Sequence, residues 1–242
     1  MKFGSPPSRR SLACHGRSHV GLVRAENEDS FGLATENGVV VVADGMGGHD
    51  NGRYVADCTV ASLCRVAPED SLEGTTRHAR EALERANNEV WRRSRDCRRT
   101  MGATLVAAVF DRDRLAVLWA GDSRAYLFRE GMLYPLTRDH SAVQDLLDNG
   151  VISPSEAVEH PMRHVVTRAL GVSPSLRVEI GYHALAAGDL VLLSSDGLHG
   201  FVSDEQIAQC LREGGLDPLD RLIDIALEGG GCDNVTAVLV RV

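Results

Sequence analysis

The sequence predicts an α+β fold in which helices cover sheets built mostly from hairpins. Apolar, β-branched stretches of strand length recur along the chain, and two long amphipathic helices follow the first of them with no strand between. A regular alternation of strand and helix, which would predict a parallel sheet, is missing. The expected strands are residues 38–44, 103–110, 114–122, 124–130, 177–184, 189–196 and 234–242.

Helical periodicity marks the segments that should cover these sheets. Apolar residues three or four positions apart run from Ala56 to Ala67 and from Ala79 to Val90, so each segment has one apolar face. A shorter stripe begins at Ile207 and ends before Gly214, a residue type common just after helices. We expect the two long helices to lie on a sheet.

Residues 139–171 form an insertion between two groups of strands. It contains a helix, an Asp-Asn-Gly turn and a second helix, whose start is marked by Ser153, Pro154 and Glu156. These residues have the pattern of a capping box with proline at the first helical position. We expect the insertion to be a mobile flap.

Length and composition indicate one domain. The chain has 242 residues, of which 43% are hydrophobic, and we expect a disordered tail over residues 1–11 and a single domain over residues 12–242. The net charge of −8 argues against nucleic acid or an anionic membrane as a partner, because both attract a positive surface. Six scattered cysteines without a CxxC pair, no signal-peptide core and only short apolar runs indicate a cytoplasmic protein with reduced thiols, which we expect to be a monomer.

Carboxylates recur at the ends of the expected strands or in short polar motifs beside them. If these strands share one end of a sheet, their acids converge and repel one another. Like charges in a low-dielectric environment stay ionised when they share a cation. Mg²⁺ and Mn²⁺ prefer oxygen ligands and keep several waters, so a few aspartates suffice. The acids are Asp29, Asp44, Asp122, Asp196 and Asp233.

Glycines next to these acids, at Gly45, Gly121 and Gly197, allow the backbone to approach a ligand closely. The alternative for each Asp-Gly pair taken singly is a plain turn, which is much more common than a metal ligand. The recurrence of the pattern, together with Arg24, His49 and the flap, favours a shared cation.

Seven motifs in order resemble those of the bacterial metal-dependent protein phosphatases, the type 2C Ser/Thr phosphatases. They are HVGLVRAENEDSFG, VVVVADGMGGHDNGR, MGATLVAAV, LWAGDSRAYL, the flap sequence that begins LTRDHS, LLSSDGLHGFVSDEQI and GGGCDNVTAVLV. The resemblance runs from about residue 18 to the end of the sequence. It implies a four-layer α-β-β-α sandwich, in which two antiparallel sheets are flanked by helices and a binuclear Mn²⁺ or Mg²⁺ site lies at one end.

The same resemblance implies roles by motif position. The implied side-chain ligands of the metal pair are Asp44, Asp196 and Asp233, with Gly45 binding through its carbonyl. Asp29 is implied to hold metal-bound water, with Glu28 behind it, and Asp122 to bind a third, weaker ion. Ala103 and His164 depart from the family pattern, which usually has a hydroxyl residue and an asparagine there, but neither is a metal ligand.

These parts predict a metal-dependent phosphoprotein phosphatase. We expect a water that bridges two cations to attack phosphoserine or phosphothreonine directly, since no CxxxxxR loop supports a cysteine nucleophile. Arg24 is expected to bind the phosphate with its planar guanidinium, and His49 to protonate the leaving oxygen. The alternatives are a solvated surface charge for Arg24 and a structural role for His49.

Two further features have an ordinary explanation that the sequence favours. His160 could reach substrate from the flap, but a histidine packed at a helix end before Pro161 fits better. The basic run at residues 91–99 could bind nucleic acid, yet it lacks interleaved aromatic residues in an acidic protein, which favours a solvated helix end.

Other functional classes remain as alternatives. The main one is a catalytically weak phosphoprotein-binding regulator on the same fold, although such a protein would be free to lose one of the acids. A Ca²⁺-binding structural domain is the third, but the chain has no D-x-D-x-D-G loop with a closing Glu. The resemblance implies phosphorylated proteins as partners: a Hanks-type Ser/Thr kinase and its substrates, including forkhead-associated-domain proteins, and a place in the control of secretion systems such as type VI.

Overall fold

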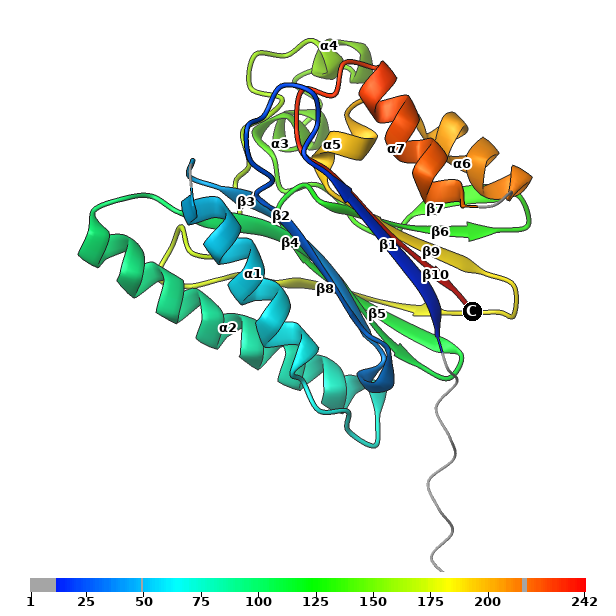
Figure 1. The fold of residues 1–242 in the computed structure, drawn as a ribbon, viewed down its shortest axis with the longest axis horizontal. Helices are drawn as coiled ribbons and strands as arrows, with labels where there is room; N and C mark the ends of the chain where they lie inside the picture. The colour runs from blue at the N-terminus through cyan, green and yellow to red at the C-terminus, as the bar shows by residue number, and fades with distance from the viewer. Residues whose placement is uncertain (1–11, 49, 215–216) are drawn as a thin grey trace, which may run out of the picture.

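The computed structural model describes residues 12–48, 50–214 and 217–242. In this described part, two antiparallel sheets of five strands each face one another, and helices cover both outer faces (Figure 1). The expected α-β-β-α sandwich is therefore confirmed. The tail expected over residues 1–11 lies outside the described residues.

The first sheet contains both the first and the last strand of the described chain. Its strands, in spatial order, are β1 (Ala13–His19), β10 (Val235–Arg241), β9 (Leu190–Ser194), β6 (Arg124–Arg129) and β7 (Met132–Pro135). Its outer face packs on α5 (Asp196–His199), α6 (Asp204–Glu213) and α7 (Pro218–Glu228), with Leu192, Leu198 and Leu222 among the fully buried contacts.

The second sheet lies under the two long helices. Its order is β2 (Asp29–Ala34), β3 (Val39–Met46), β4 (Gly102–Asp111), β5 (Arg114–Ala120) and β8 (Glu179–Ala184). A short 3₁₀ helix, Thr35–Asn37, joins β2 to β3, and α1 (Asp50–Cys64) and α2 (Leu72–Cys97) cover the outer face of the sheet. The expectation that both long helices lie on a sheet is confirmed.

The valine run of β3 is buried on both faces because this strand lies inside the sandwich. Val39 and Val41 belong to the core under α1 and α2, whereas Val40 and Val42 belong to the core between the sheets. Successive strand residues point to opposite faces, so a continuous apolar run fits this position. From the first sheet, Val191, Leu193 and Val238 meet β3 in the central core.

The seven expected strands are present, with ends that differ from the prediction by at most two residues. The structure adds β1, β2 and β7, which the sequence did not predict. All three are edge strands, and one-sided exposure weakens an apolar pattern. Helix α7 was also missed, although Asp217 accepts a hydrogen bond from the Leu219 amide as its N-cap and Pro218 begins it.

The insertion contains the two expected helices, α3 (Ala142–Asp148) and α4 (Pro154–Val158). The predicted capping box is formed at Ser153 and Glu156. A short bridge between Ser141 and Val166 pairs the two ends of the insertion with each other, and a bridge between Ala103 and Leu170 attaches its C-terminal end to β4. Its mobility as a flap stays a prediction.

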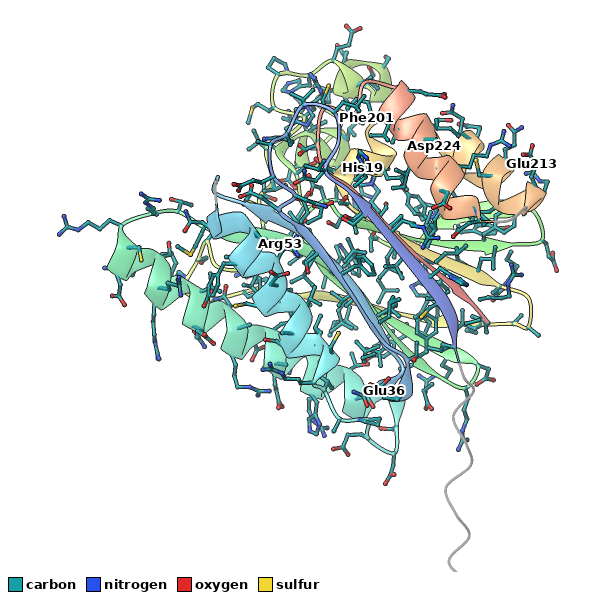
Figure 2. The ribbon with its side chains drawn as sticks, viewed as in Figure 1. His19, Glu36, Arg53, Phe201, Glu213 and Asp224 are labelled. Carbon is teal, nitrogen blue, oxygen red and sulfur yellow. The ribbon has the colours of Figure 1, made fainter. Side chains whose placement is uncertain are left out.

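Strand direction brings the predicted acids to one end of the sandwich. Strands β3 and β5 run in the same direction, because each is antiparallel to β4, and β2 begins where β3 ends. Figure 2 places His19, the last residue of β1, at this end and Glu36 at the opposite end. In the described ranges of the chain, no helix is both long and apolar enough to cross a membrane.

Candidate functional site

Asp29 and Asp44 form the centre of the site. They lie opposite each other on β2 and β3, and Thr104 of β4 lies opposite Asp44 on its other side. The Ser195 hydroxyl donates a 2.8 Å hydrogen bond to Asp29 Oδ2, and the Thr236 amide donates to Ser195 Oγ at 3.0 Å. Asp29 of one sheet is therefore positioned by a loop and a strand of the other.

The other acids surround this pair. Asp122 follows β5 and is buried, Asp196 is the first residue of α5, and Asp233 lies two residues before β10. Asp122 and Asp196 lie two residues beyond the last strand residue, and Asp233 does not open its strand as the sequence suggested. These differences move no acid away from the site end.

Burial and mutual repulsion raise the pKa values of the cluster. Burial comes first in every case: it raises the pKa of Asp29 and of Asp122 to about 7. The pKa of Asp44 lies well above its ordinary value, through burial and then the charges of Asp29, Asp196, Asp122 and Asp233. The pKa of Asp196 is raised by burial and by Asp233. The five acids thus act on one another, as the sequence predicts.

The carboxylate oxygens of this cluster fit a hard cation. Within the part of the chain that the structure describes, Asp29 Oδ1 and Glu28 Oε1 are buried without a hydrogen-bond partner, and burial raises the pKa of Glu28. A buried carboxylate oxygen without a donor is costly unless a proton or a cation satisfies it. Among the described residues, no three His, Cys, Asp or Glu side chains already converge as a complete metal site. A hydrated Mg²⁺ or Mn²⁺ ion needs fewer protein ligands than that, because water fills the remaining positions.

Two glycines allow the backbone segments of the site to touch. A Cβ atom on Gly45 would lie 2.3 Å from the Gly52 carbonyl oxygen and 2.6 Å from that of Glu28. A Cβ atom on Gly197 would lie 1.9 Å from the Asn234 carbonyl oxygen. Any side chain at these positions would push apart the turns that carry Asp44, Asp196 and Asp233. Gly121 has a φ of 118° and precedes Asp122 in a conformation that favours glycine.

Asn234 connects three segments of the site. Its Oδ1 accepts a 2.8 Å hydrogen bond from the Glu28 amide, and its Nδ2 donates to the carbonyls of Val20 and Glu26 at 2.8 and 2.9 Å. The loop between β1 and β2 is therefore held against the start of β10. Asn234 lies within one of the motifs, but the sequence indicates no role for it. The signal that the sequence offered was the position of Asn234 directly after Asp233, an expected metal ligand.

Arg24 lies on that same loop and pairs with a predicted ligand. Its Nη2 lies 2.7 Å from Asp233 Oδ2, and the side chains are 55% and 36% exposed. The hydrogen bond to Asp233 raises the pKa of Arg24. The structure thus brings Arg24 to the acid cluster, at its exposed side. His49 lies outside the described residues.

The base of the flap contacts the Asp122 loop through His140. The Gly121 amide donates to His140 Nδ1 at 3.1 Å, the His140 amide donates to the Gly121 carbonyl at 2.9 Å, and the Thr167 amide donates to the His140 carbonyl at 2.8 Å. Trp119 stacks on the imidazole with the ring centroids 6.0 Å apart. Sequence analysis missed His140, because a histidine in a predicted helix start carries no distinctive pattern.

The two departures from the family pattern lie near the site. Ala103 is buried and pairs through its backbone with Leu170, while the neighbouring Thr104 hydroxyl bonds the Ser123 hydroxyl at 2.7 Å. His164 of the flap lies close enough to Asp196 to offset a small part of the rise that burial and Asp233 cause in the pKa of Asp196. His160 accepts a hydrogen bond from the Met162 amide at 3.2 Å, which supports the local structural role that the sequence favours.

Known proteins share both the fold of this chain and its sequence pattern. The sequence pattern described as protein phosphatase 2C (PP2C) matches residues 15–221. The chain belongs to the protein phosphatase 2C family. PstP of Mycobacterium tuberculosis, a serine/threonine protein phosphatase, is 40% identical over 233 residues, which cover 93% of this PP2C chain and 44% of that protein. The chain therefore spans less than half the length of this curated relative.

Solved structures of the PP2C family superimpose on this one closely. PppA of Pseudomonas aeruginosa, described as a key regulatory component of T6SS, has a TM-score of 0.89 and 37% identity, covering 96% of this chain and 98% of that one. The catalytic domain of PstP in complex with two manganese ions has a TM-score of 0.85 and 36% identity, covering 95% and 97%.

Proposed function

We propose that this chain hydrolyses phosphoserine and phosphothreonine in proteins with the help of Mn²⁺ or Mg²⁺. The observation that carries the proposal is the cluster of five acids at one end of a PP2C sandwich, in which burial and mutual repulsion raise the pKa values of four. A bound cation would stabilise the ionised form of these carboxylates. The manganese complex of the related PstP domain supports the choice of ion.

The residues proposed to hold the two core ions are Asp44, Asp196 and Asp233, with the Gly45 carbonyl. Asp29 would orient water beside them, because Ser195 holds one of its oxygens and Oδ1 has no hydrogen-bond partner in the described part of the chain. Asp122 would serve a third ion at the base of the flap. Bound divalent ions lower the pKa of water and neutralise developing charge on a phosphate.

Arg24 and His49 are proposed to act on the substrate itself. Arg24 lies at the exposed side of the cluster and already pairs with a carboxylate, and its planar guanidinium presents the same donors to phosphate oxygens. His49 follows Asp44 by five residues and is proposed to give a proton to the departing serine or threonine oxygen. No nucleophilic side chain is required.

The substrates proposed are phosphorylated proteins, among them a Hanks-type Ser/Thr kinase and its targets, such as forkhead-associated-domain proteins. The T6SS role of the related PppA supports secretion control as one setting for this activity.

Phosphate release from a phosphothreonine peptide tests the proposal directly. We expect turnover with Mn²⁺, none with excess EDTA, and weaker turnover with Ca²⁺, whose larger coordination shell positions water poorly. Asp44→Asn is the matched control, because it removes one charge from the cluster and keeps the side-chain size. Full activity in EDTA would refute metal dependence. Tight binding of the phosphopeptide without turnover would favour the phosphoprotein-binding regulator.

A further inference from the structure

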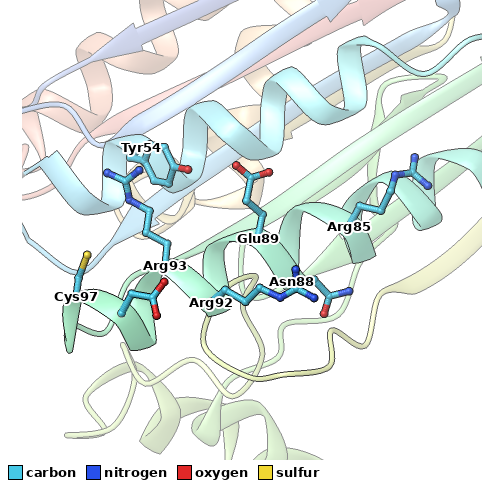
Figure 3. Close-up of a pocket in the computed structure, with 8 residues that line it drawn as sticks. Tyr54, Arg85, Asn88, Glu89, Arg92, Arg93 and Cys97 are labelled. Atoms are coloured by element: carbon cyan, nitrogen blue, oxygen red, sulfur yellow. The ribbon is translucent and has the colours of Figure 1, made fainter.

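A basic groove lies outside the site, between α1 and the C-terminal half of α2 (Figure 3). It is lined by Tyr54 of α1 and by Arg85, Glu89, Arg92, Arg93 and Asp96 of α2, among others. These α2 positions recur every three or four residues, so they share one face of the helix. We refer to it as the α1–α2 groove.

Arginines dominate this end of α2 in a chain whose net charge is −8. Residues 85–99 contain six arginines and two acids, and none of the six forms an ion pair with a carboxylate of the described residues. Elsewhere on the molecule exposed arginines do pair, as Arg53 does with Asp57 and Arg114 with Glu73. Three of the six, Arg85, Arg92 and Arg93, line the groove together with the acids Glu89 and Asp96, so the groove has a small excess of positive charge that no ion pair holds.

The groove has a fixed aromatic wall. The Arg93 guanidinium stacks on the Tyr54 ring, 4.1 Å from its centroid, which limits the orientations of a long side chain. A stacked guanidinium keeps its edge donors free for a carboxylate. A fully solvated helix end, which the sequence favours for residues 91–99, would not require this contact.

The groove begins next to the acid cluster. Gly52 contacts Gly45, where an added Cβ would lie 2.3 Å from the Gly52 carbonyl oxygen, and Tyr54 follows two residues later. On the other side, the connection after α2 reaches Gly47, where an added Cβ would lie 2.8 Å from the Thr100 carbonyl oxygen. Both walls of the groove thus continue into the turn after Asp44. A chain bound at the cluster can extend into the groove.

We propose that the α1–α2 groove docks an acidic segment, rich in Asp and Glu, that flanks the phosphorylated residue of a protein substrate. The proposal rests on the proposed function in taking the partner to be the substrate. Nucleic acid fits less well, because Glu89 and Asp96 interrupt the positive surface and the rings of Tyr54 and Trp91 are each covered by an arginine. Separate carboxylates on a flexible peptide can avoid the two acids.

Two phosphothreonine peptides test the docking. Both carry a flexible Gly-Ser linker after the phosphothreonine, followed in one by six glutamates and in the other by six glutamines. We expect the acidic peptide to have a KM lower by about five- to ten-fold, an advantage that decreases as salt is raised. The triple variant Arg85→Glu/Arg92→Glu/Arg93→Glu should lose this advantage and keep its turnover of p-nitrophenyl phosphate.

A second triple variant controls for net charge. Arg65→Glu/Arg177→Glu/Arg241→Glu makes the same change at arginines outside the groove and should keep the preference for the acidic peptide. Equal KM values for the two peptides on the unaltered protein, or equal loss in both triple variants, would overturn the proposal.

Binding measured without turnover separates this proposal from the proposed function. Fluorescence anisotropy of a labelled hexaglutamate peptide should show binding to the unaltered protein and weaker binding to the groove variant, even if no phosphoester is hydrolysed. If single-stranded RNA of equal charge displaces the peptide at lower concentration than unlabelled hexaglutamate does, nucleic acid is the occupant and the proposal is wrong.

Discussion

Asp29 and Asp44 occupy directly opposed positions on neighbouring strands, so a buried carboxylate and a half-buried one share one cross-strand pair. Like charges at such a position destabilise a sheet. Both pKa values are raised, that of Asp29 to about 7. The protein therefore carries a destabilising pair at its centre, which a bound cation would relieve.

This pair predicts a pH-dependent stability in the metal-free protein. In the folded state Asp29 has a pKa of about 7, whereas an ordinary aspartate carboxyl has a pKa of 3.8. The folded state therefore binds this proton more tightly than the unfolded state does. The free energy of unfolding consequently falls as the pH rises between these two values. In EDTA, Asp29→Asn should therefore raise the melting temperature by an amount that grows from pH 5 to pH 7.5. The comparison with the unaltered protein is needed because burial lowers the pKa of His140, His183 and His199, which act in the opposite direction.

Manganese supplies the control for this prediction. With saturating Mn²⁺, the advantage of Asp29→Asn should disappear, because the ion compensates the charge of the carboxylate. Thermal melts at several pH values with and without Mn²⁺ measure both effects. A constant difference between the two proteins across this pH range in EDTA would contradict the assignment of the pKa shift to Asp29.

Asp196 and Asp122 should differ in their effect on metal binding. Asp196→Asn removes a proposed ligand of the core ions and should lower kcat by more than about 100-fold. Residues that only hydrogen-bond to metal ligands typically contribute about 10- to 100-fold, so the loss at a ligand should be larger. Asp122→Ala should leave the tight sites intact and lower kcat by about 10-fold. Titration calorimetry with Mn²⁺ distinguishes the two. Loss of the tight sites in Asp122→Ala, with their retention in Asp196→Asn, would reverse the roles.

Arg24 and His49 should separate binding from chemistry. Arg24→Ala should raise KM by about 10- to 100-fold with little change in kcat, since a charge-assisted hydrogen bond holds the phosphate throughout. His49→Ala should lower kcat on a phosphothreonine peptide by about 100-fold or more. On p-nitrophenyl phosphate, whose leaving group needs little protonation, the His49 defect should shrink. Equal losses on both substrates would mean that His49 donates no proton.

Asn234 should matter for stability as well as for activity. Asn234→Ala leaves the Glu28 amide and the carbonyls of Val20 and Glu26 without their partner, which should cost roughly 2 to 3 kcal/mol. That corresponds to a melting temperature lower by about 4 to 12 °C. Asn88→Ala, at an exposed position of α2, is the control and should change the melting temperature little. An unchanged melting temperature in Asn234→Ala would contradict the role of this side chain in joining the loops.

The sequence predicts the parts of this protein that repeat a strong local pattern. The valine run of β3 and the stripe of α2 are local signals: β3 lies within two residues of its predicted ends, and α2 contains the predicted stripe from Ala79 to Val90 and extends beyond it on both sides. Edge strands such as β1 have a polar face and gave no such signal. The acids were found because each follows or precedes a strand. Ser195, Asn234 and His140 were not, because their roles arise from contacts between segments up to 214 residues apart.

The pairing of β1 with β10 determines when this site can exist during synthesis. Arg24 and Asp233 are separated by 209 residues, and Asp29 depends on Ser195 and Thr236 for its hydrogen-bonded position. At translation rates of about 5 to 20 residues per second, the ribosome needs about 10 to 40 s to reach Asp233 after Arg24 has been added. Until β10 emerges and inserts between β1 and β9, Asp233 stays apart from the acids of the second sheet. The proposed site can therefore be complete only after β10 has been synthesised.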